Sequence, residues 1–343
     1  MTAEHRALRE AVAGLLEKRS PESRVRDLMA TDTGHDETIW RELAEMGLLG
    51  LAIPEAHGGT GAGHVELGIV MEEMGRALLC APFLSTAVLA PALLAATDDH
   101  TEQAQVLPRI AAGSVIVTVA HAEVGAAVLP DQLSTRAHRG ADGWALSGAK
   151  NYVLDGAAAD LIYVLADTDD GPGVFAVNRD AHGLTATTLT TVDATRKLAA
   201  LDFASTPARL VGQIGSGRTA FEAALQAGGV ALVSEQAGGA QRVVRMAADY
   251  AGARFQFARA IGSFQAIKHM CAEMLLRSEQ ASVAASDAAQ AAMGDDPDQL
   301  ALAAAVAAAT VIETARANTK DCIQVLGGIG ITWEHDAHLY LRR

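Results

Sequence analysis

The chain has 343 residues, of which 50% are apolar and only 4% aromatic, and its formal net charge is −14. This length permits two or three subdomains or one composite fold, and the abundance of alanine favours closely packed helices over a β-sandwich. The acidic balance argues against non-specific nucleic-acid binding, which requires clustered Lys and Arg, but it leaves room for a local basic site for one anionic ligand.

The first part of the chain is predicted to be helical. Apolar residues recur at helical spacing from Glu4 to about Ile110. A proline and several glycines interrupt this pattern in AIPEAHGGTGAG, residues 52–63, which is predicted to be a loop. Helical spacing resumes at Val65–Leu79. We therefore expect an N-terminal helical domain over residues 1–113.

The middle of the chain is predicted to be a small β-domain over residues 114–211. Short apolar or β-branched runs alternate there with Gly, Asp and Asn turns. The candidate strands are Ser114–Ala120, Trp144–Ser147, Leu161–Ala166, Gly173–Val177 and Lys197–Phe203.

Helical spacing returns after GQIGS, residues 212–216, and continues to the end of the sequence. Long helices are expected at Phe221–Ala258, Ile261–Met293 and Pro297–Gln324. The acidic turn GDDPD, residues 294–298, separates the last two. Residues 212–343 are therefore expected to form a C-terminal helical bundle.

The sequence carries no signal for a metal site. Cys80, Cys271 and Cys322 are far apart, and no CxxC pair or Cys/His cluster accompanies them. His335 and His338 lack further ligands at a suitable spacing. We expect reduced, mostly buried thiols in a cytoplasmic protein.

A membrane-embedded protein is not expected. The N-terminal residues are charged throughout, without the apolar core of a signal peptide. The Ala-rich run Leu300–Val311 is too short to cross a bilayer, and no longer apolar stretch is predicted.

Four groups of motifs resemble the acyl-CoA dehydrogenase family, in the same order along the chain. They are the N-terminal signature in Trp40–Gly63 and Glu66–Leu78, the β-hairpin motif in Ala145–Asp160, and the C-terminal signatures ARFQFARAIGSFQ (Ala253–Gln265) and QVLGGIGIT (Gln324–Thr332). Each motif alone is moderately specific, whereas all of them in register form a strong resemblance.

The resemblance implies a mostly helical α+β fold, with an N-terminal helical domain, a middle β-barrel-like domain and a C-terminal four-helix bundle. It also implies FAD as cofactor, acyl-CoA thioesters as substrates, an electron-transfer acceptor, and assembly into dimers or dimers of dimers. No nucleic-acid or membrane partner is implied.

In this family, the ARFQF motif reaches across a subunit interface to the neighbour's FAD. The resemblance carries this role to Arg254, Gln256, Phe257 and Gln265. A guanidinium suits a pyrophosphate, and glutamine amides suit ribose or adenine. From the helical spacing alone, the alternative is a core stripe in which Phe257, Ile261, Phe264 and Cys271 are buried.

The second cofactor candidate is the loop Gln324–Gly328, through Gln324, Gly327 and Gly328. Glycines after a helix allow left-handed backbone and close approach of a ligand. By resemblance this loop contacts the adenosine half of a neighbouring subunit's FAD; the alternative is an ordinary glycine C-cap.

The β-domain departs from the family where a flavin ring would bind. In AHAEVGAAVLPD, residues 120–131, Glu123 and Gly125 match the family loop, but its hydroxyl positions are Ala and Val. A second hydroxyl contact is absent from Tyr152–Leu154. Missing donors would leave buried flavin atoms unpaired, at about 1–3 kcal/mol each. We therefore expect a partner to provide the flavin-ring pocket.

The catalytic base is also missing from its family positions. Most members place a glutamate beyond the position of Arg343, and a minority place it where this chain has Gly228. Glu222 lies nearby, and Glu235 lies about two turns further on roughly the same helix face. Glu235 is a weak candidate for a displaced base; the alternative is a solvated or ion-paired helix residue.

The resulting hypothesis is a subunit of an FAD-dependent acyl-CoA dehydrogenase that performs α,β-desaturation of an acyl-CoA thioester, with a longer homologous subunit as its partner in a heterotetramer. Its ending resembles short subunits of actinobacterial heteromeric enzymes, several of which act on steroid-derived thioesters. The alternatives are a self-sufficient homo-oligomer, a flavin-free scaffold subunit and a related flavin monooxygenase.

Overall fold

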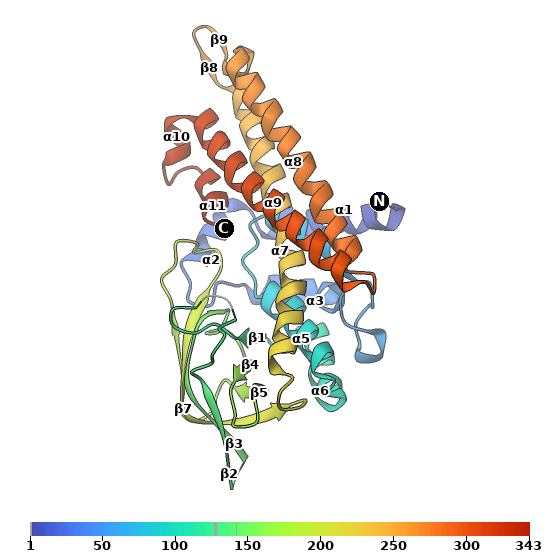
Figure 1. The fold of residues 1–343 in the computed structure, drawn as a ribbon. Helices are drawn as coiled ribbons and strands as arrows, with labels where there is room; N and C mark the ends of the chain where they lie inside the picture. Colours follow the sequence, from blue (N-terminus) through green and yellow to red (C-terminus); the bar gives the residue numbers. More distant parts are fainter. Residues whose placement is uncertain (1, 127–128, 142) are drawn as a thin grey trace. The chain divides into compact units, whose positions relative to one another are not determined.

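The computed structural model describes residues 2–126, 129–141 and 143–343 (Figure 1). Its elements follow the order helices, strands, helices, and the predicted mostly helical α+β class is confirmed. Contacts group the chain into two compact units, residues 1–26, 64–79 and 229–343 in the first and residues 27–63 and 80–228 in the second. The expected division at 113/114 and 211/212 follows the order of elements along the sequence and stays a prediction.

The second unit contains the helices α3 (Glu37–Glu45), α5 (Ala90–Thr97) and α6 (His100–Ala111). Short turns interrupt them: the 3-10 turns η1 (Leu48–Gly50) and η2 (Glu55–His57), and the π-helical segment η3 (Leu84–Leu89). Capping explains where two of the helices begin, since the carboxylates of Asp36 and Asp99 accept backbone N–H groups of α3 and α6. Helix α2 (Glu22–Met29) extends across the boundary between the units.

A seven-stranded sheet forms the rest of this unit, in the order β1-β4-β5-β7-β3-β2, with β6 paired to β7. Its strands are β1 (Val117–Ala120), β2 (Arg136–Gly140), β3 (Gly143–Leu154), β4 (Leu161–Ala166), β5 (Gly173–Asn178), β6 (Leu184–Thr188) and β7 (Leu198–Val211). Only the β1–β4 pairing is parallel among those described. The core between the strands includes Leu146, Phe175 and Leu201, all fully buried.

The β-domain differs from the sequence prediction at its edges. The candidate Trp144–Ser147 is part of a longer strand, β3, and β2 and β6 were not predicted. Both missed strands are polar or threonine-rich and half exposed, because each has a sheet neighbour on one side only. Their residues therefore lack the apolar runs that identify buried strands.

The first unit is built from helices. It contains α1 (Ala3–Arg19), α4 (His64–Arg76), the second part of α7 (Gly217–Ala253), α8 (Gln265–Ala291), α9 (Pro297–Leu326), and the short α10 (Gly328–Ile331) and α11 (Ala337–Arg342). Helices α4 and α7 touch through glycine. A Cβ on Gly75 would lie 1.9 Å from the Glu235 carbonyl oxygen, and one on Gly238 would lie 1.8 Å from that of Glu72. Only glycine permits this backbone approach.

Between α7 and α8 the sequence prediction of two nearly continuous helices is wrong. Helix α7 ends at Ala253, and a two-stranded hairpin, β8 (Phe255–Gln256) and β9 (Arg259–Ala260), precedes α8 (Figure 1). Phe257 and Ala258 form its turn with φ of 53° and 62°, which is incompatible with a right-handed helix. The Ile261 N–H donates to the Arg254 carbonyl at 2.8 Å and closes the base of the hairpin.

The expectation that no segment is long and apolar enough to span a membrane is wrong for α9. By length and hydropathy alone this helix meets that criterion, although 28% of its apolar window is buried inside the protein. Ala303, Ala307 and Val311 of α9 pack into a core with α7 and α8. A core helix passes the same test, so the finding is weak evidence for a membrane span.

Candidate cofactor-binding site

The hairpin between α7 and α8 presents the first group of predicted cofactor residues. Arg254, Gln256 and Phe257 lie on it, Gln265 is the first residue of α8, and all of them are exposed. Phe257 has 87% of its surface exposed. The alternative of a buried core stripe through Phe257 is therefore wrong.

The polar groups of this segment are not used inside the protein. Within the described part of the chain, the side chains of Arg254, Gln256 and Gln265 make no hydrogen bond, ion pair or cation–π contact, whereas nearby Arg259 makes a cation–π contact. The Arg259 guanidinium stacks on the Phe264 ring at 4.0 Å, and Phe264 contacts Phe257 edge to face. The hairpin is thus held by stacking, while a guanidinium and two amides stay available for a ligand.

The start of α8 adds backbone donors beside Gln265. Its N-cap residue, Phe264, provides no side-chain cap, and the first hydrogen bond of the helix is from the Lys268 N–H to the Phe264 carbonyl. The N–H groups of Gln265, Ala266 and Ile267, in the first turn of α8, are therefore open. A helix start of this kind favours phosphate oxygens. Sequence reasoning missed it because the helix was expected to begin at Ile261.

The second group of predicted residues lies at the junction of α9 and α10. Gln324 is exposed near the end of α9, and Gly327 and Gly328 follow it, also exposed. Gly327 has φ of 65° and ends the helix, as expected for a glycine C-cap. Gly328 needs no such freedom, and a Cβ there would meet nothing within 4 Å. The packing of the chain therefore does not explain glycine at position 328, whereas approach of an external group would.

The loop after β1 uses its polar groups internally. The Glu123 carboxylate accepts hydrogen bonds from Lys150 Nζ at 2.7 Å and from Ser134 Oγ at 2.6 Å. It also accepts hydrogen bonds from the backbone N–H groups of Ser134 and Thr135, at 2.7 and 3.0 Å. Both oxygens are thus occupied, and Lys150 is fully buried. Although burial raises the pKa of Glu123, hydrogen bonds from Lys150 and Ser134 outweigh it and lower the pKa to about 2. Burial lowers the pKa of Lys150 to about 8.

Two positions near this loop bear on the expected flavin-ring contacts. Ala122, which precedes Glu123, is buried and has no hydroxyl. Tyr152 is half exposed and has φ of 55°, an unusual backbone for a tyrosine. The substituted positions Ala127 and Val128 lie outside the described residues.

His121 and Lys150 were not singled out from the sequence. The His121 ring lies 6.2 Å from that of Phe221, and its Nδ1 is buried without a hydrogen-bond partner among the described residues. Burial, and then the charge of Lys150, lower the pKa of His121 to about 4. No local signal marks either residue, because their contacts join segments far apart in the sequence.

Two of the three candidate base positions, Gly228 and Glu235, are also packed internally. A Cβ on Gly228 would lie 2.5 Å from Leu89 Cδ2, so a larger residue there requires Leu89 to move. Glu235 is buried, and its Oε1 lies 2.8 Å from Nε of Arg343. Glu222 is exposed on α7. Among the residues described, no cluster of three or more His, Cys, Asp or Glu is placed to hold a metal ion.

Comparison with known families identifies both ends of the chain. Residues 2–114 match the family described as "Acyl-CoA dehydrogenase, N-terminal domain". Residues 215–343 match "Acyl-CoA dehydrogenase, C-terminal domain".

Two curated relatives come from Mycobacterium tuberculosis. The acyl-CoA dehydrogenase FadE34 is 39% identical over 305 residues, which cover 89% of this chain but only 39% of that protein. The acyl-CoA dehydrogenase IpdE2 is 36% identical over 342 residues, which cover 99% of this chain and 90% of that protein. The chain therefore matches IpdE2 over most of its length and FadE34 over less than half.

Solved structures give the same fold. A structure titled "Tcur3481-Tcur3483 steroid ACAD G363A variant" is 32% identical with a TM-score of 0.87, covering 98% of this chain and 91% of that chain. The ChsE4-ChsE5 complex from M. tuberculosis is 27% identical with a TM-score of 0.88, covering 99% and 91%. The protein therefore belongs to the acyl-CoA dehydrogenase family.

Proposed function

We propose that this chain is a subunit of an FAD-dependent acyl-CoA dehydrogenase that desaturates an acyl-CoA thioester between its α and β carbons. The observation that carries the proposal is the unpaired polar surface around Arg254 and the start of α8, in contrast to a β1 loop whose carboxylate is occupied internally. A surface of this kind fits a nucleotide contributed across a subunit boundary. The family membership provides the reaction class.

The residues present fit the pyrophosphate and adenosine parts of FAD. Arg254 would pair with the pyrophosphate, and the open N–H groups of α8 would donate to its oxygens. Gln256, Gln265 and Gln324 would bond ribose or adenine, Phe257 would pack on the nucleotide, and Gly327 and Gly328 would leave room for it. When bound, FAD supplies the acceptor for the hydride that leaves the β carbon.

A partner subunit would provide the flavin-ring pocket and the glutamate that removes the α proton. Large apolar side chains exposed on α8 and α9, among them Leu276, Val283, Leu302 and Ile312, support burial of these helices against another subunit. The two solved structures named above have titles that pair two components. We infer a longer homologous partner in a heterotetramer, and the first title suggests a steroid-derived thioester as substrate.

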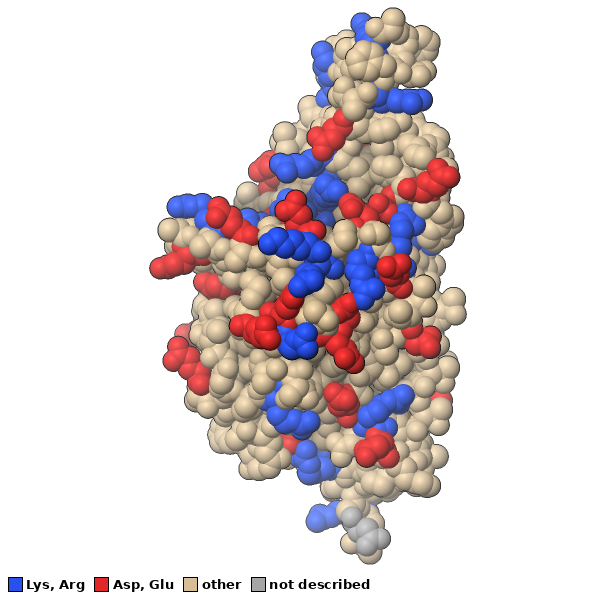
Figure 2. All heavy atoms as spheres, turned by 180° about the vertical axis from the view of Figure 1, so that it is seen from behind, with Lys and Arg blue, Asp and Glu red and all other residues tan. Residues whose placement is uncertain are grey.

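The charge distribution agrees with a small-molecule enzyme. On the face drawn in Figure 2, cationic and anionic side chains are interspersed, with uncharged surface around them. An extended basic stripe of the kind that nucleic-acid binding requires is not visible on that face. We propose a cytoplasmic enzyme that passes its electrons to a soluble electron-transfer acceptor.

Counting flavins tests the proposal. The chain should be purified alone and after co-expression with a longer homologue encoded beside it. We expect a colourless chain alone and about one FAD per two chains in the complex, the stoichiometry of a site shared between unlike subunits. One FAD per chain in the protein purified alone would overturn the proposal.

The second candidate is a self-sufficient homo-oligomer in which Glu235 acts as the base. The ion pair of Glu235 with Arg343 favours a structural role instead. Replacing Glu235 with Gln leaves the buried Arg343 guanidinium without this carboxylate and should destabilise the fold by about 3 kcal/mol. A Glu235→Gln protein that keeps its stability and its flavin but loses all turnover would establish this second candidate.

The third candidate is a flavin-free scaffold subunit. It predicts that the flavin content of the complex does not depend on this chain. Removing the Arg254 guanidinium would then change neither flavin content nor assembly. Loss of FAD from an intact Arg254→Ala complex would exclude the scaffold.

A further inference from the structure

The first unit contains a cavity, open to solvent on one side, that the proposed flavin contacts do not use. It has a volume of about 870 Å³ and lies between α1, α4, α7 and α8. This volume is typical of sites for small molecules. Its lining is mixed: apolar side chains, among them Val65, Ile69, Val244 and Leu275, lie next to polar and charged ones. Small residues on facing helices leave the space open.

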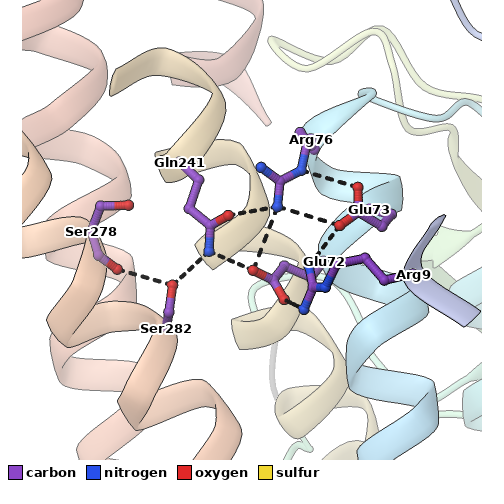
Figure 3. Close-up of polar contacts among 7 residues, drawn as sticks. All are labelled: Arg9, Glu72, Glu73, Arg76, Gln241, Ser278 and Ser282. Carbon is purple, nitrogen blue, oxygen red and sulfur yellow. Dashed lines mark hydrogen bonds and ion pairs between the residues drawn. The ribbon is translucent and has the colours of Figure 1, made fainter. Parts of the chain in front are cut away.

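A network of hydrogen-bonded side chains forms one side of the cavity (Figure 3). Arg9 donates to Glu72 and Glu73, at 2.6 Å in each case. Arg76 donates to Glu73 at 3.1 Å and to the side-chain amide oxygen Oε1 of Gln241 at 2.5 Å. The two arginines thus already face two carboxylates, so their charge is neutralised within the protein.

The network continues across to α8. The Gln241 amide donates to Glu72 and, at 2.6 Å, to Ser282 Oγ. Ser282 Oγ in turn donates to the Ser278 carbonyl at 3.0 Å. Each of these polar groups therefore has a partner inside the protein.

The hydroxyl of Ser278 is the exception. Ser278 lines the cavity, is 98% buried, and its Oγ has no hydrogen-bond partner among the described residues. A helical serine usually donates to the carbonyl one turn back, here that of Met274. That oxygen already accepts the helical N–H of Ser278 and the Asn318 amide at 2.9 Å. In Figure 3, Ser278 lies on the side of α8 that faces Gln241 of α7.

The rim carries charges of both signs. Arg245, Asp249 and Glu279 contribute to it, and His5 is held 2.9 Å from Glu66. Arg9 and Arg76 are paired internally, and the carboxylates of Asp249 and Glu279 offset the charge of Arg245, so the described residues direct no net positive charge at the cavity. A polyanion such as a nucleotide or a CoA thioester is therefore a poor fit, since it requires a surplus of Lys or Arg.

We propose that this cavity binds a neutral, mainly apolar molecule that places one hydroxyl or carbonyl oxygen against the Ser278 hydroxyl. The apolar side chains of the lining bury the body of the ligand. The Ser278 hydroxyl, which has no hydrogen-bond partner within its own helix, bonds to the ligand oxygen. This site is chemically distinct from the FAD and acyl-CoA sites of the proposed function, because both of those ligands are anionic.

The test uses 6-propionyl-2-dimethylaminonaphthalene, a neutral aryl ketone whose emission shifts to shorter wavelength in apolar surroundings. Equilibrium dialysis against the full chain, in the assembly in which it is purified, gives the dissociation constant. We expect saturable binding with blue-shifted emission. Ser278→Ala should weaken binding roughly fivefold, the typical loss for one neutral hydrogen bond.

A blocked cavity provides the second arm. Ser286 lines the cavity from an exposed position on α8, so Ser286→Trp should remain folded, fill the space and weaken binding roughly tenfold or more. Gln280→Trp is the matched control, because Gln280 is exposed on α8 but outside the cavity, and it should bind as the unmodified chain does. Thermal unfolding verifies that each variant is folded.

The outcomes separate clearly. Binding that Ser286→Trp and Gln280→Trp affect equally would show that the probe sits on exposed apolar surface, and it would overturn the proposal. Absence of saturable binding would do the same. Binding unchanged in Ser278→Ala would refute the recognition of an oxygen by this serine. The residues proposed to contact FAD do not line this cavity, so these results are independent of the FAD-to-chain ratio that tests the proposed function.

Discussion

The hairpin between α7 and α8 and the loop after β1 use polar side chains in opposite ways. Around the hairpin, Arg254 and Gln265 have no partner within the described part of the chain, and the start of α8 is uncapped. In the loop, both oxygens of Glu123 are occupied by donors of the chain itself. Both segments contain residues that match family motifs, so a match alone does not reveal whether a residue serves the fold or a ligand. The hydrogen-bond partners do.

The largest effect is expected from breaking the internal pair of the loop. Lys150→Met leaves the Glu123 carboxylate buried without its cation, and we expect the free energy of unfolding to fall by about 3–5 kcal/mol in urea titration. Arg316→Met, at an exposed pair with Glu313 on α9, is the control and should be indistinguishable from the unmodified chain. A Lys150→Met protein as stable as the parent would remove the structural role assigned to this pair.

Removal of a cation at the hairpin should weaken ligand binding and leave the fold intact. Arg254→Ala removes an unpaired exposed guanidinium, so thermal unfolding should not shift. In the co-expressed complex we expect FAD to bind roughly thirtyfold more weakly, the equivalent of about 2 kcal/mol for a charge-assisted bond. Arg139→Ala, at an exposed arginine of β2, is the matched control. Equal flavin retention in both variants would contradict the proposed contact.

The sequence predicted the order of the elements, but it predicted neither the hairpin nor the internal contacts of the loop. Helical and strand periodicity predicted the order of elements, because buried faces impose their spacing on the sequence. The hairpin was missed because Phe257 and Ala258 carry no turn signal, and two phenylalanines at helical spacing suggest a helix. The pairing of Glu123 with Lys150 and the contact of the His121 ring with the tilted Phe221 ring join distant segments, so only the fold reveals them.

A pH titration tests the loop more finely. Because the pKa of His121 is lowered to about 4 from an ordinary value near 6.5, the unfolded chain binds more protons between these values. Stability should therefore fall as the pH drops from 7 to 5, by about 1–2 kcal/mol. His121→Leu should abolish this part of the slope, whereas replacement of the exposed His182 should leave it unchanged. Glu123 contributes only below about pH 4.5, where stability is lost as the pH approaches 2.

The smallest effect on stability is expected at the α9–α10 junction. Gly328→Ala adds a methyl group into open space, so unfolding should change by no more than about 0.5 kcal/mol. Gly327→Ala, with φ of 65°, should cost about 1 kcal/mol. If FAD approaches the backbone here, Gly328→Ala should still lower flavin retention in the complex. Full retention would restrict the cofactor contact to the hairpin.

The turn of the hairpin has a consequence for how this segment behaves before any ligand arrives. A two-residue connection with both residues in the left-handed region normally contains Asn-Gly, because other side chains crowd the backbone there. Phe257 and Ala258 occupy those places, so the connection is intrinsically disfavoured by about 1–2 kcal/mol. The hairpin should therefore open more readily than the helices on either side, and faster amide exchange at Gln256–Arg259 in the isolated chain, slowed by assembly, would be its signature.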